Sequence, residues 1–436
     1  MLNKYIPLFE KDVMINFAIQ IILFIFSFVT GVIISRTLGP SGKGIYSIAT
    51  MIPAMAALLI NLGLNSSNIY YIGKKTYPTG TIIGNTFFFA LFAGTLLSAI
   101  LLCFSGKLSL LFLKDANPVY LYLTLPSITL ILLFSNIYNI FIAHRDMIKL
   151  AIHNVSQVLI YFLIIVLLFF FNGVTVQNII FAFLAGYTVS TVVGVYFIFK
   201  SNYFLKLSID LQVFYEMIKF GFKQHLGAIF QIFNYQLDMF IIAVMLNSTQ
   251  VGLYSIAVLI GGVIWYIPNS LSQILFSKTA ASSSNTANDF TPLVCRNVTF
   301  LVFLIVSFVF FIAGPLIPFI FTDKFNPSII ALRLLLPGIF FLSISKVLAS
   351  DIVGRGFPHY ASYASFISLL FTITLDLVLI PIYGINGAAV ASSIAYFVHA
   401  LVTLYYFNKI TKISLKEVFL IKLADFSYYK NIFSRF

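Results

Sequence analysis

The feature that most constrains this chain is a succession of apolar segments, each of 18 or more residues, between Val13 and Phe407. A helix of about 20 apolar residues crosses the roughly 30 Å hydrocarbon core of a bilayer. The composition agrees, because 60% hydrophobic and only 9% charged residues leave too little polar surface for soluble domains. No strand-like alternation competes with these segments. The sequence therefore predicts an all-α, polytopic membrane protein.

Turn residues divide the apolar sequence into about twelve predicted transmembrane helices. Examples are Gly39-Pro40-Ser41-Gly42, Asn172-Gly173 and Tyr383-Gly384. The predicted spans cover residues 13–35, 44–72, 81–104, 118–143, 151–172, 177–199, 219–246, 250–277, 296–321, 329–350, 360–380 and 385–408.

Basic residues predict the orientation. With a cytoplasmic N-terminus, 20 of the 26 Lys and Arg residues fall on the cytoplasmic side. We therefore expect an inner-membrane protein with both termini in the cytoplasm and no removable signal peptide. The net charge of +13 reflects this bias and not a nucleic-acid partner. Residues 412–436 predict an amphipathic cytoplasmic tail lying on anionic membrane lipid.

The chain repeats itself with a period near 210 residues. Gly44-Ile45-Tyr46-Ser47-Ile48-Ala49 returns 208 residues later as Gly252-Leu253-Tyr254-Ser255-Ile256-Ala257, and Arg145 returns after 210 residues as Arg355. The same register pairs Asn61 with Asn269 and Asn65 with Gln273. Because each half holds an even number of spans, we predict two six-helix bundles related by a pseudo-two-fold axis along the membrane normal. The predicted bundles are residues 1–210 and 211–411, with a cavity between them.

Polar residues inside the predicted spans are the candidate functional residues. Gln224, Gln231 and Asp238 recur at seven-residue intervals on one helix, with Asn234 between them. Asn16 and Gln20 begin a similar stripe on the first helix. Such side chains are costly against lipid, so they turn toward other helices or a wet cavity. Hydrogen bonding between helices without any role in transport is the alternative for the amides.

Other unusual positions have structural interpretations. Asp376 is expected to be solvated near the outer interface, and Lys346 to extend toward the inner one. Pro53 and Pro268 predict kinks that could serve as hinges. Cys103 and Cys295 predict buried small apolar side chains.

Enzyme signatures are missing from the sequence. Only three glutamates occur, and there is no paired-carboxylate motif, metal-ligand cluster or phosphate-binding glycine loop. We therefore expect no catalytic residues, metal or cofactor. Because no ATP-binding domain is present, any transport would be driven by a gradient, a membrane potential or substrate flux, with H+ or Na+ as a possible coupling ion.

Several segments together resemble a known family. Ser35-Arg36-Thr37-Leu38-Gly39, Asp238-Met239-Phe240 with Val251-Gly252-Leu253-Tyr254-Ser255, and Ile380-Pro381-Ile382-Tyr383-Gly384-Ile385-Asn386-Gly387 carry the resemblance. The sequence is similar to the bacterial polysaccharide biosynthesis family. These are the O-antigen-type flippases of the multidrug/oligosaccharidyl-lipid/polysaccharide exporter superfamily.

The resemblance implies a function. Such flippases move undecaprenyl-diphosphate-linked oligosaccharides to the outer leaflet by alternating access, for O-antigen or capsule assembly. A polysaccharide polymerase and chain-length machinery are the implied partners. Cavity cations are expected to bind the diphosphate, yet no Lys or Arg of this chain falls clearly at mid-membrane. A cation-coupled drug or metabolite antiporter on the same fold, or a nontransporting scaffold, are the alternatives.

The residues expected to line the cavity or bind substrate combine the polar stripes, the repeat positions and the basic residues at the outer helix ends. They are Asn16, Gln20, Arg36, Lys43, Tyr46, Asn61, Asn65, Gln224, Gln231, Asn234, Asp238, Tyr254, Asn269 and Gln273, with Arg145 and Arg355 as basic residues on the cytoplasmic side.

Overall fold

The computed structural model describes residues 6–114, 117–201, 203, 206–419 and 422, and side chains from Ile19 onward except those of residues 284, 285 and 415. Every regular element in these residues is a helix, as predicted. Contacts divide the chain into two compact units. The N-terminal unit contains residues 1–229 and 246–252, and the C-terminal unit contains residues 230–245 and 253–436.

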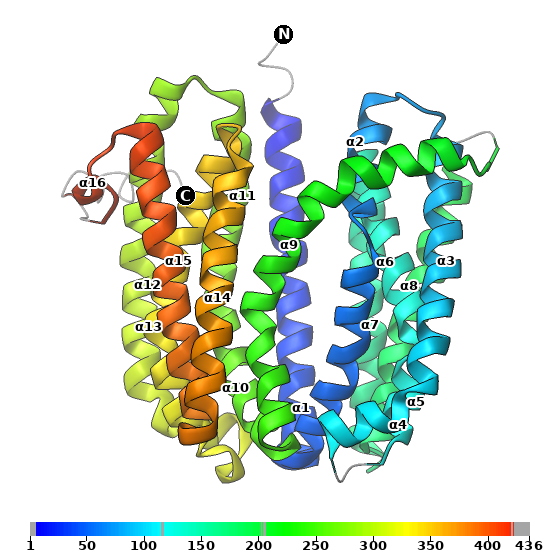
Figure 1. Ribbon diagram of the computed structural model, residues 1–436, viewed down its shortest axis with the longest axis vertical. Coiled ribbons are helices and arrows are strands. Elements are labelled where there is room, and N and C mark those ends of the chain that lie inside the picture. Colours follow the sequence, from blue (N-terminus) through cyan, green and yellow to red (C-terminus); the bar gives the residue numbers. More distant parts are fainter. Residues whose placement is uncertain (1–5, 115–116, 202, 204–205, 420–421, 423–436) are drawn as a thin grey trace. The chain divides into compact units, whose positions relative to one another are not determined.

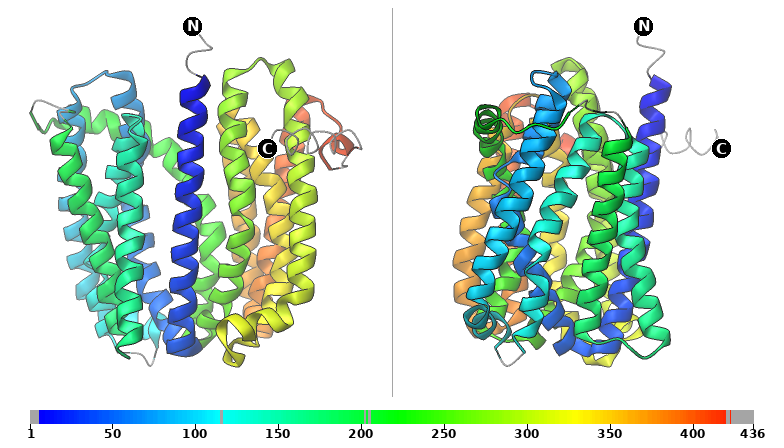
Figure 2. Two further views of the ribbon diagram at one scale, coloured as in Figure 1. Left: turned by 180° about the vertical axis from the view of Figure 1, so that it is seen from behind. Right: turned by 90° about the vertical axis from the view of Figure 1, so that its right-hand side faces the viewer.

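The helices of each unit run roughly along one direction and join through short turns at their ends (Figures 1 and 2). The N-terminal unit is built from α1 (Ile6–Ile60), α2 (Leu64–Lys74), α3 (Thr79–Cys103), α4 (Ser105–Leu108), α5 (Val119–Thr124), α6 (Ser127–Ala143), α7 (Met147–Phe170) and α8 (Val176–Lys200). The next helices are α9 (Leu211–Met245), which runs from one unit into the other, and α10 (Ser248–Ile264). The C-terminal unit continues with α11 (Tyr266–Ala281), α12 (Ser284–Phe321), α13 (Ser328–Gly354), α14 (Pro358–Tyr383), α15 (Ile385–Thr411) and α16 (Leu415–Phe419).

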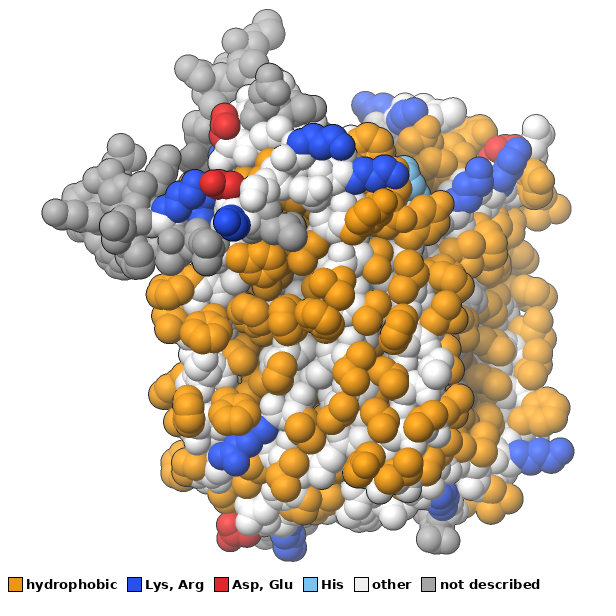
Figure 3. Space-filling model, turned by 60° about the vertical axis from the view of Figure 1, so that its left-hand side comes forward, with side chains coloured by type: hydrophobic (Ala, Val, Ile, Leu, Met, Phe, Trp, Pro, Cys, Tyr) orange, Lys and Arg blue, Asp and Glu red, His pale blue; other side chains and the backbone are white. Residues whose placement is uncertain are grey.

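The number of spans agrees with the prediction. In the described residues, ten helices are long and apolar enough to cross a membrane, and α10 and α11 form one further span bent by 42°. The helix α1 contains a non-helical residue, Gly39, whose φ of 66° favours glycine. Gly39 divides α1 into a first arm, residues 6–38, and a second arm, residues 40–60. Counting these two arms as separate spans gives the twelve spans expected. Figure 3 shows the corresponding surface on one face, where apolar side chains cover the middle and charged ones lie toward the two ends.

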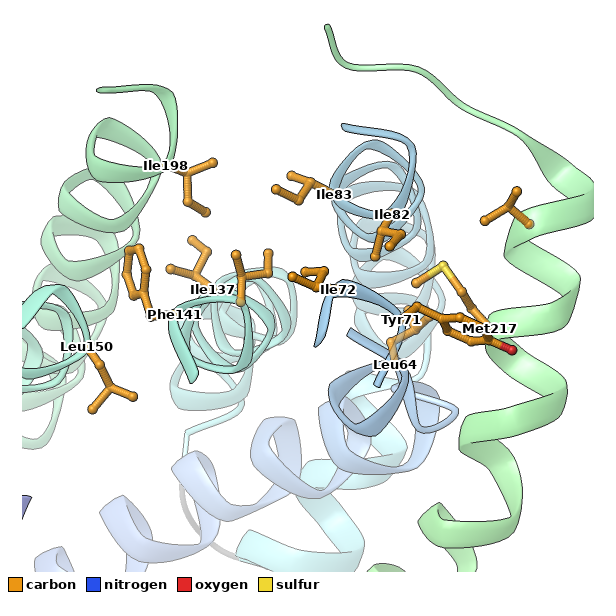
Figure 4. Close-up of a cluster of buried hydrophobic side chains, with 12 residues drawn as sticks. Leu64, Tyr71, Ile72, Ile82, Ile83, Ile137, Phe141, Leu150, Ile198 and Met217 are labelled. Atoms are coloured by element: carbon orange, nitrogen blue, oxygen red, sulfur yellow. The ribbon is translucent and has the colours of Figure 1, made fainter. Parts of the chain in front are cut away.

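An apolar cluster explains why the beginning of α9 belongs to the N-terminal unit. Met217 of α9 is fully buried among Leu64 and Tyr71 of α2 and Ile82 of α3 (Figure 4). The Ser67 hydroxyl donates to the Met217 carbonyl over 2.5 Å. We expected the two halves to divide at residues 210 and 211, but the contacts divide the chain inside α9.

At the start of α10, two interlocking glycines, Gly44 of α1 and Gly252 of α10, each pack closely against the other's segment. A Cβ atom at Gly44 would lie 1.7 Å from the Ser248 carbonyl oxygen, and one at Gly252 would lie 1.8 Å from the Pro40 carbonyl oxygen. The repeat register of 208 residues relates Gly44 to Gly252 and Pro40 to Ser248. The two contacts are therefore equivalent under the internal repeat, and both require a residue without a side chain.

The structure contradicts the expectation for one of the two cysteines and describes only part of the predicted tail. Cys295 is buried as expected, but Cys103 is exposed at the end of α3. Most of the predicted amphipathic tail lies outside the described residues. The described part, α16, packs against α12 and buries Val418 completely.

The orientation predicted from the basic residues can be tested by cysteine labelling. Asn172 and Lys75 are both exposed and lie in turns at opposite ends of N-terminal helices. In a variant with Cys103 and Cys295 replaced, we expect Asn172→Cys to react with a membrane-impermeant maleimide in intact cells. Lys75→Cys should react only after permeabilisation. The reverse pattern would contradict the orientation inferred from the 20 basic residues.

Candidate functional site

A buried carboxylate lies within the C-terminal unit. Asp238 of α9 is only 2% exposed. One of its oxygens accepts hydrogen bonds from the Tyr254 hydroxyl of α10 over 2.5 Å and from the Ser392 hydroxyl of α15 over 3.1 Å. The other oxygen accepts from the Met239 backbone N–H over 2.7 Å. These bonds solvate the carboxylate but supply no positive charge.

A second buried carboxylate comes from α14. Asp376 is fully buried, and neither of its side-chain oxygens has a hydrogen-bond partner among the described residues. It lies close enough to Asp238 for the two groups to interact electrostatically. The expectation of a solvated Asp376 near the outer interface is wrong, because neighbouring helices cover the side chain on all sides.

Amide and hydroxyl contacts one helical turn away hold the two carboxylate-bearing helices together. The Asn234 side-chain NH2 donates to the Ser365 carbonyl of α14 over 2.6 Å, and its oxygen accepts from Thr372 over 3.2 Å. The Tyr396 hydroxyl of α15 donates to the Asn234 carbonyl over 3.3 Å. Asn234 and Thr372 each precede an aspartate by four residues, so this contact places Asp238 and Asp376 one helical turn further along α9 and α14.

This arrangement can hold a small positive charge. Two carboxylates in a low-dielectric interior repel each other, and the described residues place no ion pair on either of them. A proton, or a cation that prefers oxygen ligands, would relieve the repulsion. The Ser392 and Tyr254 hydroxyls add further oxygen atoms beside the pair. We refer to Asp238, Asp376, Ser392 and Tyr254 as the carboxylate site.

The polar residues predicted to form a stripe on α9 differ in how deeply they are buried. Gln224 and Gln231 are exposed, whereas Asn234 and Asp238 are buried within the C-terminal unit. The seven-residue spacing does keep these residues near one face. Gln224 lies in the part of α9 that belongs to the N-terminal unit, and the other three residues lie in the part that belongs to the C-terminal unit, where Gln231 is exposed and Asn234 and Asp238 are buried.

The paired repeat positions have different environments in the two units. Tyr254 is completely buried and bonded to Asp238, so its ring is not available to stack on a sugar in this structure. Its counterpart Tyr46 is partly exposed and accepts a hydrogen bond from the Tyr161 hydroxyl over 2.7 Å. Asn61 is 3% exposed and bonds to Asn65, whereas Asn269 and Gln273 are exposed on α11.

The predicted basic positions fall at helix ends and at the break in α1. Arg36 is exposed on the first arm of α1, and the Lys43 ammonium lies 5.5 Å from the centre of the Tyr46 ring. Arg145 is exposed after α6, whereas its repeat partner Arg355 is nearly buried in an ion pair with Asp351.

The remaining predicted positions are placed as follows. Gln20 is partly exposed on α1, and the side chain of Asn16 lies outside the described part of the chain. The helix continues through Pro53, and its non-helical residue is Gly39. Pro268 lies in the first turn of α11, directly after the 42° bend. Their roles as hinges remain predictions.

An apolar cavity in the N-terminal unit is unsuited to a sugar. It has a volume of about 380 Å³ and is lined by Ile60 at the end of α1 and by side chains of α3 and of the segment 209–214. Asn85 is the polar residue in its lining, and the side chain of Asn85 is already bonded to the backbone of Asp210 in both directions, over 2.9 Å. The cavity therefore offers a sugar hydroxyl almost no partners.

Sequence comparison identifies the family. The sequence pattern of the family described as polysaccharide biosynthesis protein matches residues 33–330, which is more than half of the chain. The chain belongs to the polysaccharide biosynthesis protein family. The match extends from the first arm of α1 to the start of α13, so it includes Asp238 and the interlocking glycines.

Individual relatives of this polysaccharide biosynthesis protein are distant. It is 22% identical over 247 residues to a Haloferax volcanii protein named "Probable low-salt glycan biosynthesis flippase Agl15", covering 56% of the present chain and 51% of the relative. The chain thus spans about half the length of this curated relative.

Solved structures show the same fold over nearly the whole chain. The lipid II flippase MurJ in an inward closed conformation matches with a TM-score of 0.78 and 18% identity, covering 96% of this chain and 93% of MurJ. An inward-facing multidrug resistance MATE transporter matches with a TM-score of 0.72 and 13% identity, covering 92% and 98%. This polysaccharide biosynthesis protein is therefore a multi-pass membrane protein with the MurJ and MATE fold.

Asp376 was not predicted from the sequence as a buried neighbour of Asp238. A signal was present, because Asn234 and Asp238 on one span and Thr372 and Asp376 on another are both polar pairs spaced by four residues. Two such pairs in apolar helices are typical of spans that pack against each other through polar groups. Their proximity, however, depended on which helices are neighbours.

Proposed function

We propose that this protein moves lipid-linked oligosaccharides from the cytoplasmic to the outer leaflet of the bacterial inner membrane by alternating access. The match to the polysaccharide biosynthesis family over residues 33–330 carries the proposal. The proposed substrate is an undecaprenyl-diphosphate-linked repeat unit for O-antigen or capsule, and a polysaccharide polymerase with its chain-length machinery would use the product.

The carboxylate site supplies the proposed coupling to an ion gradient. Its two buried acidic groups need a proton or a monovalent cation such as Na+, and binding or release of that charge would change how α9, α14 and α15 pack. A nontransporting scaffold would have no use for such a pair. The drug or metabolite antiporter has less support, since both the family and the H. volcanii relative are named for glycan biosynthesis.

The proposal predicts that Asp238→Asn blocks export without preventing folding. Asparagine keeps the size and can still accept from Tyr254 and Ser392, but it removes the charge that the coupling ion requires. In a strain lacking the gene, we expect the variant to reach normal membrane levels and to restore less than about a tenth of the surface glycan. Lipid-linked repeat units should accumulate on the cytoplasmic side.

The matched control is Asp323→Asn, which removes an exposed carboxylate in the turn before α13. It should restore export fully. Full export by Asp238→Asn would exclude an essential charge there. If loss of the gene itself left the surface glycan and its lipid-linked precursors unchanged, the proposed function would be wrong.

A further inference from the structure

A lysine inside the C-terminal unit sits over two aromatic rings. Lys346 lies on α13 eight residues before its last residue, Gly354, which corresponds to about 12 Å along the helix axis. Its ammonium lies 4.9 Å from the ring centre of Tyr235 on α9 and 4.9 Å from that of Trp265. The side chain therefore stays within the helical bundle beside these rings, and the expectation that it extends toward the inner interface does not describe this structure.

Polar groups complete the surroundings of this lysine. The Lys346 ammonium donates to the side-chain oxygen of Asn269 on α11 over 3.0 Å, and the Gln231 amide donates to the Tyr235 hydroxyl over 3.3 Å. Among the described residues, no carboxylate forms an ion pair with Lys346. We call Lys346, Tyr235, Trp265, Asn269 and Gln231 the lysine cluster.

The lysine cluster remains accessible and keeps unused hydrogen-bonding capacity. Lys346, Tyr235 and Trp265 are partly exposed, and Asn269 and Gln231 are exposed. The Trp265 indole N–H has no hydrogen-bond partner among the described residues although that atom is covered. An ammonium with three donors uses one on Asn269, so it can still donate to an anionic oxygen.

We propose that the lysine cluster binds a sugar that carries an anionic group. Trp265 and Tyr235 pack against each other, with ring centres 5.2 Å apart, and their partly exposed sides offer apolar surface to a sugar ring. The amides of Asn269 and Gln231 can bond its hydroxyls, and Lys346 pairs with the anion. The anion is either the phosphate at the reducing end of the oligosaccharide or a carboxylate on one of its sugars. This inference rests on the proposed function for the presence of a glycan, and it adds which residues select the charge.

The lysine cluster also explains how the lysine tolerates its position. The two rings and the Asn269 oxygen partly replace water around the ammonium. A ligand anion would offer Lys346 a full negative charge, which neither ring provides. The site therefore favours anionic over neutral sugars.

Trp265 makes this proposal directly testable, because it is the single tryptophan of the chain. Purified full-length protein in detergent would be titrated with glucose 1-phosphate, glucuronate and glucose while the Trp265 emission is followed. We expect a saturable change with at least one anionic sugar at a concentration about tenfold below that needed for glucose. A response to glucose 1-phosphate alone assigns the anion to the reducing-end phosphate, and one to glucuronate alone assigns it to an acidic sugar.

Variants of the lysine separate charge from packing. Lys346→Met should raise the half-saturating concentration of the anionic sugar about tenfold, to that of glucose, whereas Lys346→Arg should stay within about threefold of the unmodified protein. The control is Lys200→Met, which removes a lysine 5.4 Å from the Tyr196 ring in the N-terminal unit and should change nothing. If Lys346→Met does not fold, Asn269→Ala serves instead and should also weaken binding.

Two results would overturn the lysine cluster as an anionic-sugar site. One is a Trp265 emission that responds to none of the anionic sugars, and the other is an unchanged affinity in the folded Lys346→Met or Asn269→Ala variant. Neither result affects the proposed function, which the glycan export of the unmodified gene tests separately.

Discussion

Adding one methyl group at Gly44 should remove most of the folded protein. The new Cβ would lie 1.7 Å from the Ser248 carbonyl oxygen, and the obstructing atom is backbone, which cannot rotate away as a side chain can. Overpacking costs about 1–3 kcal/mol where neighbours can adjust, so we expect Gly44→Ala to cost about 3 kcal/mol or more. Gly252→Ala should behave alike, because its Cβ would lie 1.8 Å from the Pro40 carbonyl oxygen. The measurement is the monodisperse yield and thermal midpoint in detergent.

The matched control is Gly262→Ala on the same helix, α10. Apart from the nearby backbone of its own helix, a Cβ atom there would meet nothing within 4 Å. Alanine also favours helix over glycine by about 1 kcal/mol, so this variant should be as stable as the original or slightly more stable. A Gly44→Ala protein with an unchanged thermal midpoint would show that the contact between α1 and α10 is looser than the structure describes.

Arg355→Met should destabilise the C-terminal unit by about 3–5 kcal/mol, the usual cost of removing one partner of a buried ion pair. The Arg355 Nε lies 2.6 Å from an oxygen of Asp351, and the two side chains are 7% and 0% exposed. Asp351 also accepts from Thr279 of α11 over 3.1 Å and from Thr291 of α12 over 2.7 Å. Without the arginine, this carboxylate would hold three helices together while carrying an uncompensated charge.

The repeat supplies the control for this prediction. Arg145 occupies the equivalent position in the N-terminal half but is exposed, so Arg145→Met should change stability by less than about 0.5 kcal/mol. Adding Asp351→Asn to Arg355→Met should recover most of the lost stability, because asparagine can still accept from both threonines. No recovery would mean that the arginine acts through packing and not through its charge.

The sequence was sufficient to predict the all-α membrane fold. Apolar segments long enough to cross a bilayer allow few other structures, because every backbone group must bond within its own helix. The repeat was also informative at particular residues. Gly44 and Gly252 were matched as equivalent positions, and the structure shows that they contact each other's segments directly.

The candidate site could be predicted only in part. Asp238 was recognised from the cost of a carboxylate inside a span, which is a property of one residue. Its partner Asp376 and the two rings around Lys346 come from other helices, so their proximity depends on helix packing that periodicity does not report. Burial was likewise unpredictable for repeat pairs such as Tyr46 and Tyr254, because the same residue type meets different neighbours in the two units.

The contact of Gly44 with Ser248 and Gly252 also bears on biosynthesis. The chain is made from its N-terminus, yet the N-terminal unit includes residues 246–252, which follow the whole of α9. That unit therefore cannot complete its own packing until α9 has entered the membrane and the start of α10 has emerged from the ribosome. The shortest fragment that carries all the contacts of the N-terminal unit ends at residue 252, and a fragment cut at residue 210 would expose the surfaces that Met217 and Gly252 normally cover.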